Sequence, residues 1–348
     1  MSDKKATSVL GEETYAQAAH ERRKGTSKGL RAVTAPIRIA VIGLGKIAHD
    51  QHLPAIARSH QFDLVATVDR AGVSEGPTPF FPSIEALIAS GIAVDAVAIC
   101  TPPQVRHDIA QTALEQGWHV LLEKPPGATI AEVVALREAA QERKVTLFTA
   151  WHSRFAPAVE AAGAWLKGRE MTRAKITWRE DVRIWHPGQD WIWAPGGFGV
   201  FDPGINGLSI ATSILPSPMF VVSSQLSFPA NLCAPIAAQV SCRDRSGAPI
   251  ELDFDFLQEG PQHWDIEVET TSGTLVLSKG GAELSVSEGA LGEHDTRGED
   301  LVGEYPGLYR RFAALVRAGV SEVDVSPMRL VADAFLRARI VQVEEFHE

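Results

Sequence analysis

Apolar and polar residues alternate along residues 37–149 in a pattern typical of strands followed by amphipathic helices. Short apolar runs predict buried parallel strands at residues 37–42, 62–68, 94–100, 119–122 and 145–149. Helical spacing predicts helices at residues 84–90, 105–116 and 130–143. Because the two kinds of segment alternate, the sequence predicts an N-terminal α/β domain with a doubly wound parallel sheet, a Rossmann arrangement.

The pattern changes in the second half of the chain. Longer β-like stretches, with no helical segment between them, occur at residues 174–179, 219–228, 237–242, 250–257, 264–271 and 274–277. Ser272-Gly273 is a hairpin signal, so we expect a C-terminal α+β domain with an open, mostly antiparallel sheet. Two amphipathic helices are predicted to follow, at residues 308–317 and 327–343.

Composition excludes several classes of protein. A chain of 348 residues favours two domains, and a net charge of −10 argues against a basic nucleic-acid footprint. No uninterrupted apolar stretch reaches the ~18 residues of a membrane helix. Cys100, Cys233 and Cys242 have neither disulfide-framework nor zinc-site spacing, so we expect a cytoplasmic protein without a metal site.

Residues 1–35 differ from the rest of the chain. They carry clusters of basic residues with interspersed acids and no apolar segment, so they do not form a secretory signal. The stretch is interpreted as an N-terminal extension, either a solvated, disordered tail or an over-extended start ahead of the first strand.

The first predicted strand enters a glycine turn, Gly43-Leu44-Gly45, and the chain leaves it in a helical segment. Gly43 permits the turn, Gly45 lets a pyrophosphate approach the backbone, and Ala48 lets helix and strand pack closely. Any tight strand-to-helix turn can produce such a pattern. Asp69, however, ends the next strand at about the offset expected of a carboxylate that binds the adenine-ribose 2′-hydroxyl, and the pair predicts dinucleotide binding.

Lys124 follows a predicted parallel strand, at the edge where doubly wound folds bind ligands. A lysine in such a loop is most often a solvated charge. Here Glu123 precedes it and two prolines follow it, which favours a positioned cation.

Asp202 and Asn206 lie four residues apart, so their side chains share one helix face if Pro203 opens a helix. The alternative is that Asp202 only caps that helix. Seven of the eight tryptophans also lie after residue 150, several beside polar residues. Indole faces next to hydrogen-bonding groups suit a polyol, although three or four of the tryptophans could instead belong to a core or an interface.

With the glycine turn, the Glu123-Lys124-Pro125 triplet and the run that ends at Asn206, the chain resembles the glucose-fructose oxidoreductase, inositol dehydrogenase and rhizopine-catabolism (Gfo/Idh/MocA) family over residues 36–345. Within it, the strings IGLGKIAHDQHLPAI, LLEKPPGAT, WHPGQDWIW and GVFDPGIN are most similar to L-arabinose and D-galactose 1-dehydrogenases. The resemblance implies a Rossmann domain at residues 36–156, a substrate-binding domain at 157–325, and a last helix within 326–348 that packs back on the Rossmann domain.

The resemblance also implies catalytic roles, with one departure. Most relatives carry a histidine four residues after the aspartate as general acid/base, whereas this chain carries Asn206, whose amide can only orient a hydroxyl. We therefore expect Asp202 to be the base for the anomeric hydroxyl and Lys124 to stabilise the developing alkoxide. The residues implied to hold the sugar ring are His152, Glu180, Trp185, His186, Asn206 and Trp264.

Asp69 favours NAD, because a 2′-phosphate would meet like charge at close range. Arg70 can accept that phosphate if Asp69 turns aside, so we expect NAD to be preferred and NADP tolerated. The residues implied to line the cofactor site are Gly43, Leu44, Gly45, Lys46, Ile47, Asp69, Arg70, Thr101, Pro102, Pro103, His107, Glu123 and Lys124.

The resulting hypothesis is an NAD(P)-dependent aldose 1-dehydrogenase that oxidises D-galactose or L-arabinose at C1 to an aldonolactone. The alternatives are a sugar oxidoreductase that never releases its cofactor and a non-catalytic NAD-binding regulator of a sugar pathway. The expected partner is a small aldose, with neither nucleic acid nor membrane, and family analogy implies a homo-oligomer, a dimer or a tetramer.

Overall fold

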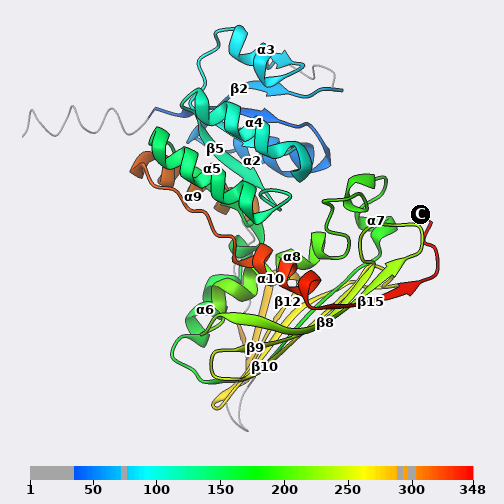
Figure 1. The fold of residues 1–348 in the computed structure, drawn as a ribbon. Coiled ribbons are helices and arrows are strands. Elements are labelled where there is room, and N and C mark those ends of the chain that lie inside the picture. Colours follow the sequence, from blue (N-terminus) through cyan, green and yellow to red (C-terminus); the bar gives the residue numbers. More distant parts are fainter. Residues whose placement is uncertain (1–34, 72–76, 288–292, 297–302, 348) are drawn as a thin grey trace, which may run out of the picture.

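The computed structural model describes residues 35–71, 77–287, 293–296 and 303–347. The extension predicted at residues 1–35 therefore lies almost wholly outside the described residues. The chain forms two domains, one around a parallel sheet and one around a larger mixed sheet (Figure 1).

The first domain has a six-stranded sheet in the order β3-β2-β1-β4-β5-β6, and every pairing is parallel. The predicted doubly wound parallel sheet is confirmed. Its strands are β1 (Ile37–Ile42), β2 (Phe62–Val68), β3 (Phe80–Phe81), β4 (Ala96–Ile99), β5 (His119–Glu123) and β6 (Leu147–Ala150). The two-residue β3 lies in a stretch rich in glycine and proline and is too short to show a strand pattern.

Helices cover both faces of this sheet. One face is covered by α3 (Ile84–Ala89), α4 (Pro103–Glu115) and α5 (Ile130–Arg143), whose apolar side chains pack with those of β1 and β4. Ser83 caps α3 by accepting from the Ala86 amide, and Thr129 and Glu132 form a capping box on α5. The other face is covered by η1 (Ala48–His52), α2 (Leu53–Ala57) and α9 (Glu304–Ala318).

The helix that returns to the Rossmann domain is α9, not the last helix as predicted. Tyr305, Leu308, Tyr309 and Phe312 of α9 are buried in the core of the parallel sheet. The last helix, α10 (Ser326–Leu336), packs instead against α8 and β8 of the second domain. The predicted helix at 327–343 also ends early, because the β-branched segment Ala338–Val343 forms strand β15.

The second domain has a nine-stranded sheet in the order β14-β13-β12-β11-β7-β10-β9-β8-β15. Two of its pairings, β7 with β10 and β8 with β15, are parallel and the others are antiparallel, as the sequence predicts for most of the sheet. The strands are β7 (Met171–Arg179), β8 (Met219–Pro229), β9 (Ala237–Asp244), β10 (Pro249–Asp255), β11 (His263–Thr270), β12 (Gly273–Ser278), β13 (Glu283–Ser287), β14 (Glu293–Thr296) and β15.

One face of this sheet carries α6 (Val159–Leu166), α8 (Phe201–Ile214) and α10, which pack with it in one large core (Figure 1). Four short helices complete the domain: η2 (His152–Phe155), α7 (Val182–Trp185), η3 (Asp190–Ile192) and η4 (Lys279–Gly281). Helix α8 lies close to the sheet, since a Cβ at Gly204 or Gly207 would come within 2.7 Å of Phe254 or Trp178.

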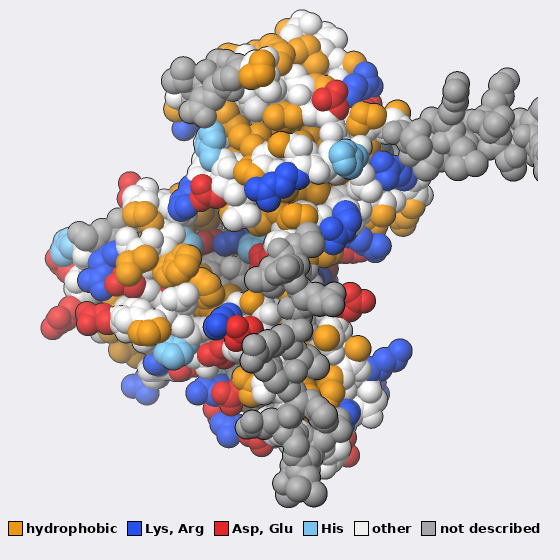
Figure 2. Space-filling model, turned by 180° about the vertical axis from the view of Figure 1, so that it is seen from behind, with side chains coloured by type: hydrophobic (Ala, Val, Ile, Leu, Met, Phe, Trp, Pro, Cys, Tyr) orange, Lys and Arg blue, Asp and Glu red, His pale blue; other side chains and the backbone are white. Residues whose placement is uncertain are grey.

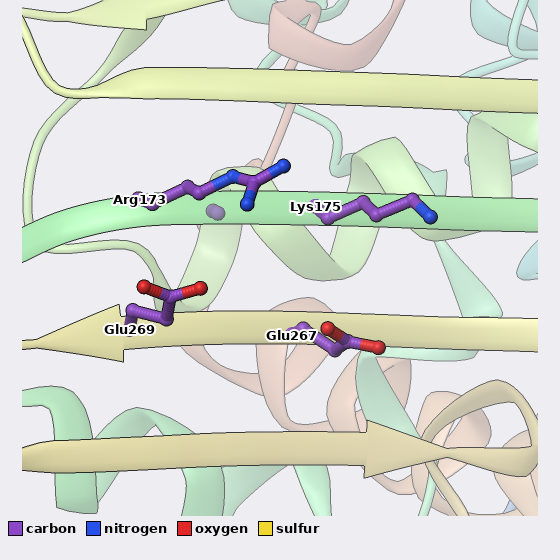
Figure 3. Close-up of a pocket in the computed structure, with 5 residues that line it drawn as sticks. Arg173, Lys175, Glu267 and Glu269 are labelled. Atoms are coloured by element: carbon purple, nitrogen blue, oxygen red, sulfur yellow. The ribbon is translucent and has the colours of Figure 1, made fainter.

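The opposite face of the sheet carries a ladder of charges. Lys175 on β7 lies opposite Glu267 on β11, and Arg173 lies opposite Glu269 (Figure 3). These side chains line a shallow hollow of about 210 Å³. Cross-strand pairs of opposite charge stabilise a sheet modestly, so we assign the hollow a structural role.

Within the described ranges, no helix has the length and apolar character needed to cross a lipid bilayer.

Candidate active site

A cavity of about 420 Å³ lies between the two domains. The Rossmann side contributes the glycine turn, the end of β4 and the end of β5, and the second domain contributes α7, the loop after it and the start of α8. Its lining residues include Gly45, Lys46, Ile47, Thr101, Pro102, Pro103, Arg106, Glu123, Lys124, Trp185, His186, Gln189, Trp191 and Asp202. The surface is hollowed between the upper and lower parts of the molecule, with acidic and basic side chains interspersed on both (Figure 2).

The glycine turn has the geometry of a dinucleotide-binding turn. Gly43 has a φ of +93°, and a Cβ there would lie 2.7 Å from the Thr101 nitrogen, so only glycine fits between β1 and β4. A Cβ at Gly45 would meet nothing within 4 Å, so the backbone there faces open space. Asp69 fixes the turn from the end of β2, because its Oδ2 accepts from the Leu44 amide at 2.7 Å.

These residues fit an NAD(P) cofactor. Gly45, Lys46 and Ile47 line the cavity at the start of a helix, where backbone amides have no intrahelical partner and favour a pyrophosphate. The Leu44 amide already donates to Asp69, so it stabilises the turn and is not free to donate to a phosphate. Arg70 is exposed beside Asp69, where a 2′-substituent of the adenine ribose is expected.

Arg106, and not the predicted His107, faces the cavity from α4. Arg106 is buried and donates to the backbone carbonyls of Thr101, Glu123 and Pro125, thereby tying the ends of β4 and β5 together. Burial lowers the pKa of Arg106 to about 10, and nearby acids oppose that shift, so it stays charged at neutral pH. His107 lies on the outer face of α4, where it contacts Asp108.

Lys124 and Asp202 meet across the domain boundary. Lys124 follows β5, and its Nζ lies 3.1 Å from Asp202 Oδ1 and 3.0 Å from the Asp202 carbonyl oxygen. Their side chains are only 13% and 3% exposed. Helix α8 begins at Phe201, so Asp202 lies within its first turn and is not its N-cap. Within the described chain no hydrogen bond occupies Asp202 Oδ2.

Glu123 holds the backbone of Lys124 in place. Its Oε2 accepts from the Lys124 amide, and its Oε1 accepts from Tyr305 at 2.5 Å and lies 3.2 Å from His52 Nε2. Burial opposes ionisation of Glu123, but these hydrogen bonds and the charge of His152 and His52 hold its pKa at about 2. Since Tyr305 belongs to α9, the helix that closes the Rossmann core also fixes the strand end that carries Lys124.

His186 joins two buried carboxylates. Its Nε2 lies 2.8 Å from Glu180 Oε1, and its Nδ1 lies 3.7 Å from Asp202 Oδ2. Glu180 Oε2 accepts from the Trp264 indole at 2.8 Å, and Trp264 packs edge-on against Trp185 with ring centroids 4.8 Å apart. Of this group, Trp185 and His186 line the cavity, whereas Glu180 and Trp264 lie behind them.

Two other predicted substrate residues lie beside the cavity and do not line it. His152 is nearly buried against Glu304 and Tyr305, and Glu304 raises its pKa against the effect of burial. Asn206 lies one turn after Asp202 on α8 and is partly buried. Direct contact of either residue with a sugar hydroxyl stays a prediction.

The tryptophans divide between core and site. Trp151, Trp178 and Trp193 are buried in the core of the second domain, as the alternative interpretation allowed for three or four of them. Trp185 and Trp191 line the cavity.

Site roles for Arg106, Gln189, His52 and Tyr305 were not predicted from the sequence, whereas Trp191 belongs to the predicted tryptophan-rich stretch. A signal existed for Arg106, because it shares the buried stripe of α4 with Ala110, Ala113 and Leu114. His52 and Tyr305 are 253 residues apart in sequence, and no local pattern brings them together.

Comparisons with known proteins identify the family and the fold. Residues 37–151 match the family model described as an oxidoreductase family with an NAD-binding Rossmann fold, Gfo/Idh/MocA. The chain is 44% identical to galactose 1-dehydrogenase from Pseudomonas fluorescens over 315 residues, which cover 90% of this chain and 99% of that enzyme.

Solved structures extend the comparison. The crystal structure of a D-galactose-1-dehydrogenase protein from Rhizobium etli is 50% identical, with a TM-score of 0.82 over 90% of this chain and 98% of that one. A 3-ketoreductase from Actinomadura kijaniata, solved with NADP and TDP-benzene, is 20% identical, with a TM-score of 0.78 over 89% of this chain and all of that one. The second likeness concerns the fold alone.

Proposed function

Since this chain belongs to the Gfo/Idh/MocA oxidoreductase family, we propose that it is an NAD(P)-dependent aldose 1-dehydrogenase that oxidises the anomeric hydroxyl of a cyclic sugar to an aldonolactone. The single observation that carries the proposal is the Lys124–Asp202 pair, which lies across the cavity that the dinucleotide turn also lines. The names of the two relatives with 44% and 50% identity support the same chemistry.

The pair divides the proton chemistry between an acceptor and a donor. Asp202 presents Oδ2 to the anomeric hydroxyl and accepts its proton, while Oδ1 stays bonded to Lys124. The Lys124 ammonium stabilises negative charge that develops on the sugar oxygen, and the low exposure of both groups strengthens that interaction. When bound, the nicotinamide accepts hydride from C1.

The substrate class follows from the walls of the cavity. Trp185 and Trp191 offer broad apolar faces, and Lys124, His186, Gln189 and Asp202 offer polar groups around them, as a pyranose ring requires. D-Galactose and L-arabinose differ only in the C5 hydroxymethyl group, which such a pocket is able to tolerate. We therefore propose both as substrates.

NAD is the proposed preferred cofactor and NADP a tolerated one. The Asp69 carboxylate lies at the end of β2, where it is suited to bind a free 2′-hydroxyl and to repel a 2′-phosphate. Arg70 next to it provides a cation for the phosphate.

A homo-oligomer, a dimer or a tetramer, is proposed by family analogy. Light scattering at micromolar concentration tests the proposal, and a monomer mass would exclude it.

The experiment for the proposed function is the initial rate of reduced-cofactor formation with NAD and then NADP. The panel contains L-arabinose, D-galactose, D-fucose, D-xylose, D-glucose and myo-inositol. Turnover on the galacto-configured sugars with a lactone product supports the proposal. Turnover on myo-inositol alone would contradict the aldose substrate class and would support only the assignment to the family. No turnover, with nucleotide still bound after purification, would favour the sugar–sugar oxidoreductase or the regulator.

A further inference from the structure

Glu180 and His186 have the arrangement of an oriented base. A carboxylate only accepts hydrogen bonds, so the 2.8 Å contact between Glu180 Oε1 and His186 Nε2 requires a proton on Nε2. In the neutral imidazole, Nδ1 is then the bare acceptor nitrogen. That nitrogen lies 3.7 Å from Asp202 Oδ2 and 3.5 Å from Oε1 of the Gln189 amide, a neutral group that does not take up a proton.

Glu180 is placed to orient the histidine and not to bind a sugar. Its side chain is 3% exposed and does not line the cavity. Both of its oxygens are used, Oε1 by His186 and Oε2 by the Trp264 indole. A nucleophile or base whose partner imidazole is fixed by a buried carboxylate is the arrangement that proton-transfer sites use on unrelated folds.

From this geometry, and resting on the proposed dehydrogenase function, we propose that His186, oriented by Glu180, is the proton acceptor for Asp202. It thereby supplies from α7 the imidazole that Asn206 cannot supply from α8. Asn206 lies one turn after Asp202 on the same helix, and its amide has no proton-transfer capacity. His186 reaches the same carboxylate from another element.

The C1 hydroxyl gives its proton to Asp202 Oδ2 while the C1 hydrogen leaves as hydride to the oxidised nicotinamide, so the sugar loses two electrons and becomes the lactone. Asp202 then passes the proton to His186 Nδ1 and returns to the carboxylate. The 3.7 Å separation closes to hydrogen-bond distance by a small side-chain movement or through one water.

The surroundings of His186 suit a group that carries a proton transiently. Two carboxylates, Glu180 and Asp202, face its ring, and the Lys124 ammonium faces Asp202 from the other side. Phe256 packs against the ring with centroids 5.6 Å apart. The side chain is 14% exposed and lines the cavity, so a proton on Nδ1 has a path toward solvent.

The test separates a relay from a sugar-binding role. In His186→Gln, the amide nitrogen can keep the bond to Glu180, but nothing remains to take up a proton at the position of Nδ1. The relay predicts that kcat for D-galactose falls by about 10²-fold while KM changes less than threefold. A raised KM with an unchanged kcat would overturn the proposal, because it is the signature of a lost hydroxyl contact. His60→Gln, at an exposed histidine outside the site, is the matched control and should leave both constants unchanged.

A second variant and a spectroscopic readout guard against a folding artefact. Added imidazole should restore kcat of His186→Ala by roughly tenfold, as expected for a missing proton acceptor. In ¹⁵N spectra of the imidazoles of the wild-type protein, the resonance assigned to His186 should show the Nε2-protonated tautomer. Absence of rescue, or an Nδ1-protonated tautomer, would overturn the relay.

The two proposals fail differently. If the wild-type protein oxidises none of the aldoses, the proposed function is wrong and the relay is wrong with it. If the wild-type protein turns over and only KM responds to His186→Gln, the relay alone is wrong.

Discussion

Lys124 Nζ lies 3.1 Å from Asp202 Oδ1, and this contact joins the end of a Rossmann strand to the start of a helix in the other domain. Neither residue makes this contact without the other domain. The docking of the two domains therefore sets the distance on which the proposed proton transfer depends.

Asp202→Asn should lower kcat by roughly 10²–10⁴-fold with the fold intact, because an amide cannot accept the hydroxyl proton. Steady-state kinetics with D-galactose measure the loss, and an unchanged thermal unfolding midpoint controls for folding. A rate near that of the wild-type protein would remove Asp202 from the role of base.

Asp69→Asn should shift the preference from NAD toward NADP by about tenfold or more in the ratio of kcat/KM values. The single amide oxygen can still accept from one of the two backbone amides that the carboxylate binds, those of Leu44 and Ala71, while the charge that repels a 2′-phosphate is gone. Asp69→Ala removes the acceptor and the charge and should also lower the free energy of unfolding. Equal preference in Asp69→Asn and the wild-type protein would mean that Asp69 only holds the turn.

Arg106→Met should lower the free energy of unfolding by about 2–5 kcal/mol, since three buried carbonyls lose a charged donor. Urea unfolding measures the change. Arg137→Met, at an exposed position on α5, is the control and should change stability by less than ~0.5 kcal/mol. A similar loss of unfolding free energy in the two variants would contradict the role of Arg106 in linking the ends of β4 and β5.

Glu123 should make the fold sensitive to acid. Its folded pKa of about 2 lies below the value of about 4.3 for an unfolded glutamate, so the native state stabilises the carboxylate. That stability is present above about pH 4.3 and is lost as the pH falls toward 2, by on the order of 2–3 kcal/mol. Urea unfolding between pH 6 and 3 should show the loss, and Glu123→Gln should flatten it. Parallel pH curves for the two proteins would contradict the assignment.

The fold could be predicted from the sequence where the signal is local. Short apolar runs and capped helices gave β1, β2, β4, α3 and α5 at nearly their observed bounds, because burial and capping act within a few residues. The choice of α9 over α10 as the helix on the parallel sheet could not be predicted this way. That choice depends on which helix has an apolar face that fits beside α2 on the parallel sheet. The α2 and α9 residues that meet there are about 250 residues apart in the chain.

The site could be predicted in part for the same reason. Gly43, Asp69, Lys124 and Asp202 stand at strand ends or a helix start that the sequence marks. The resemblance implied His107 on α4, whereas the buried stripe of that helix places Arg106 inside. The connection from Glu180 through His186 to Asp202 arises only when β7, α7 and α8 meet.

The central claim is oxidation at C1, and transfer of label tests it most directly. D-Galactose carrying deuterium at C1 should give the lactone without the label and reduced cofactor heavier by one mass unit, in equal amounts. Reduced cofactor without deuterium, or deuterium retained in the sugar product, would place the oxidation at another carbon and contradict the account.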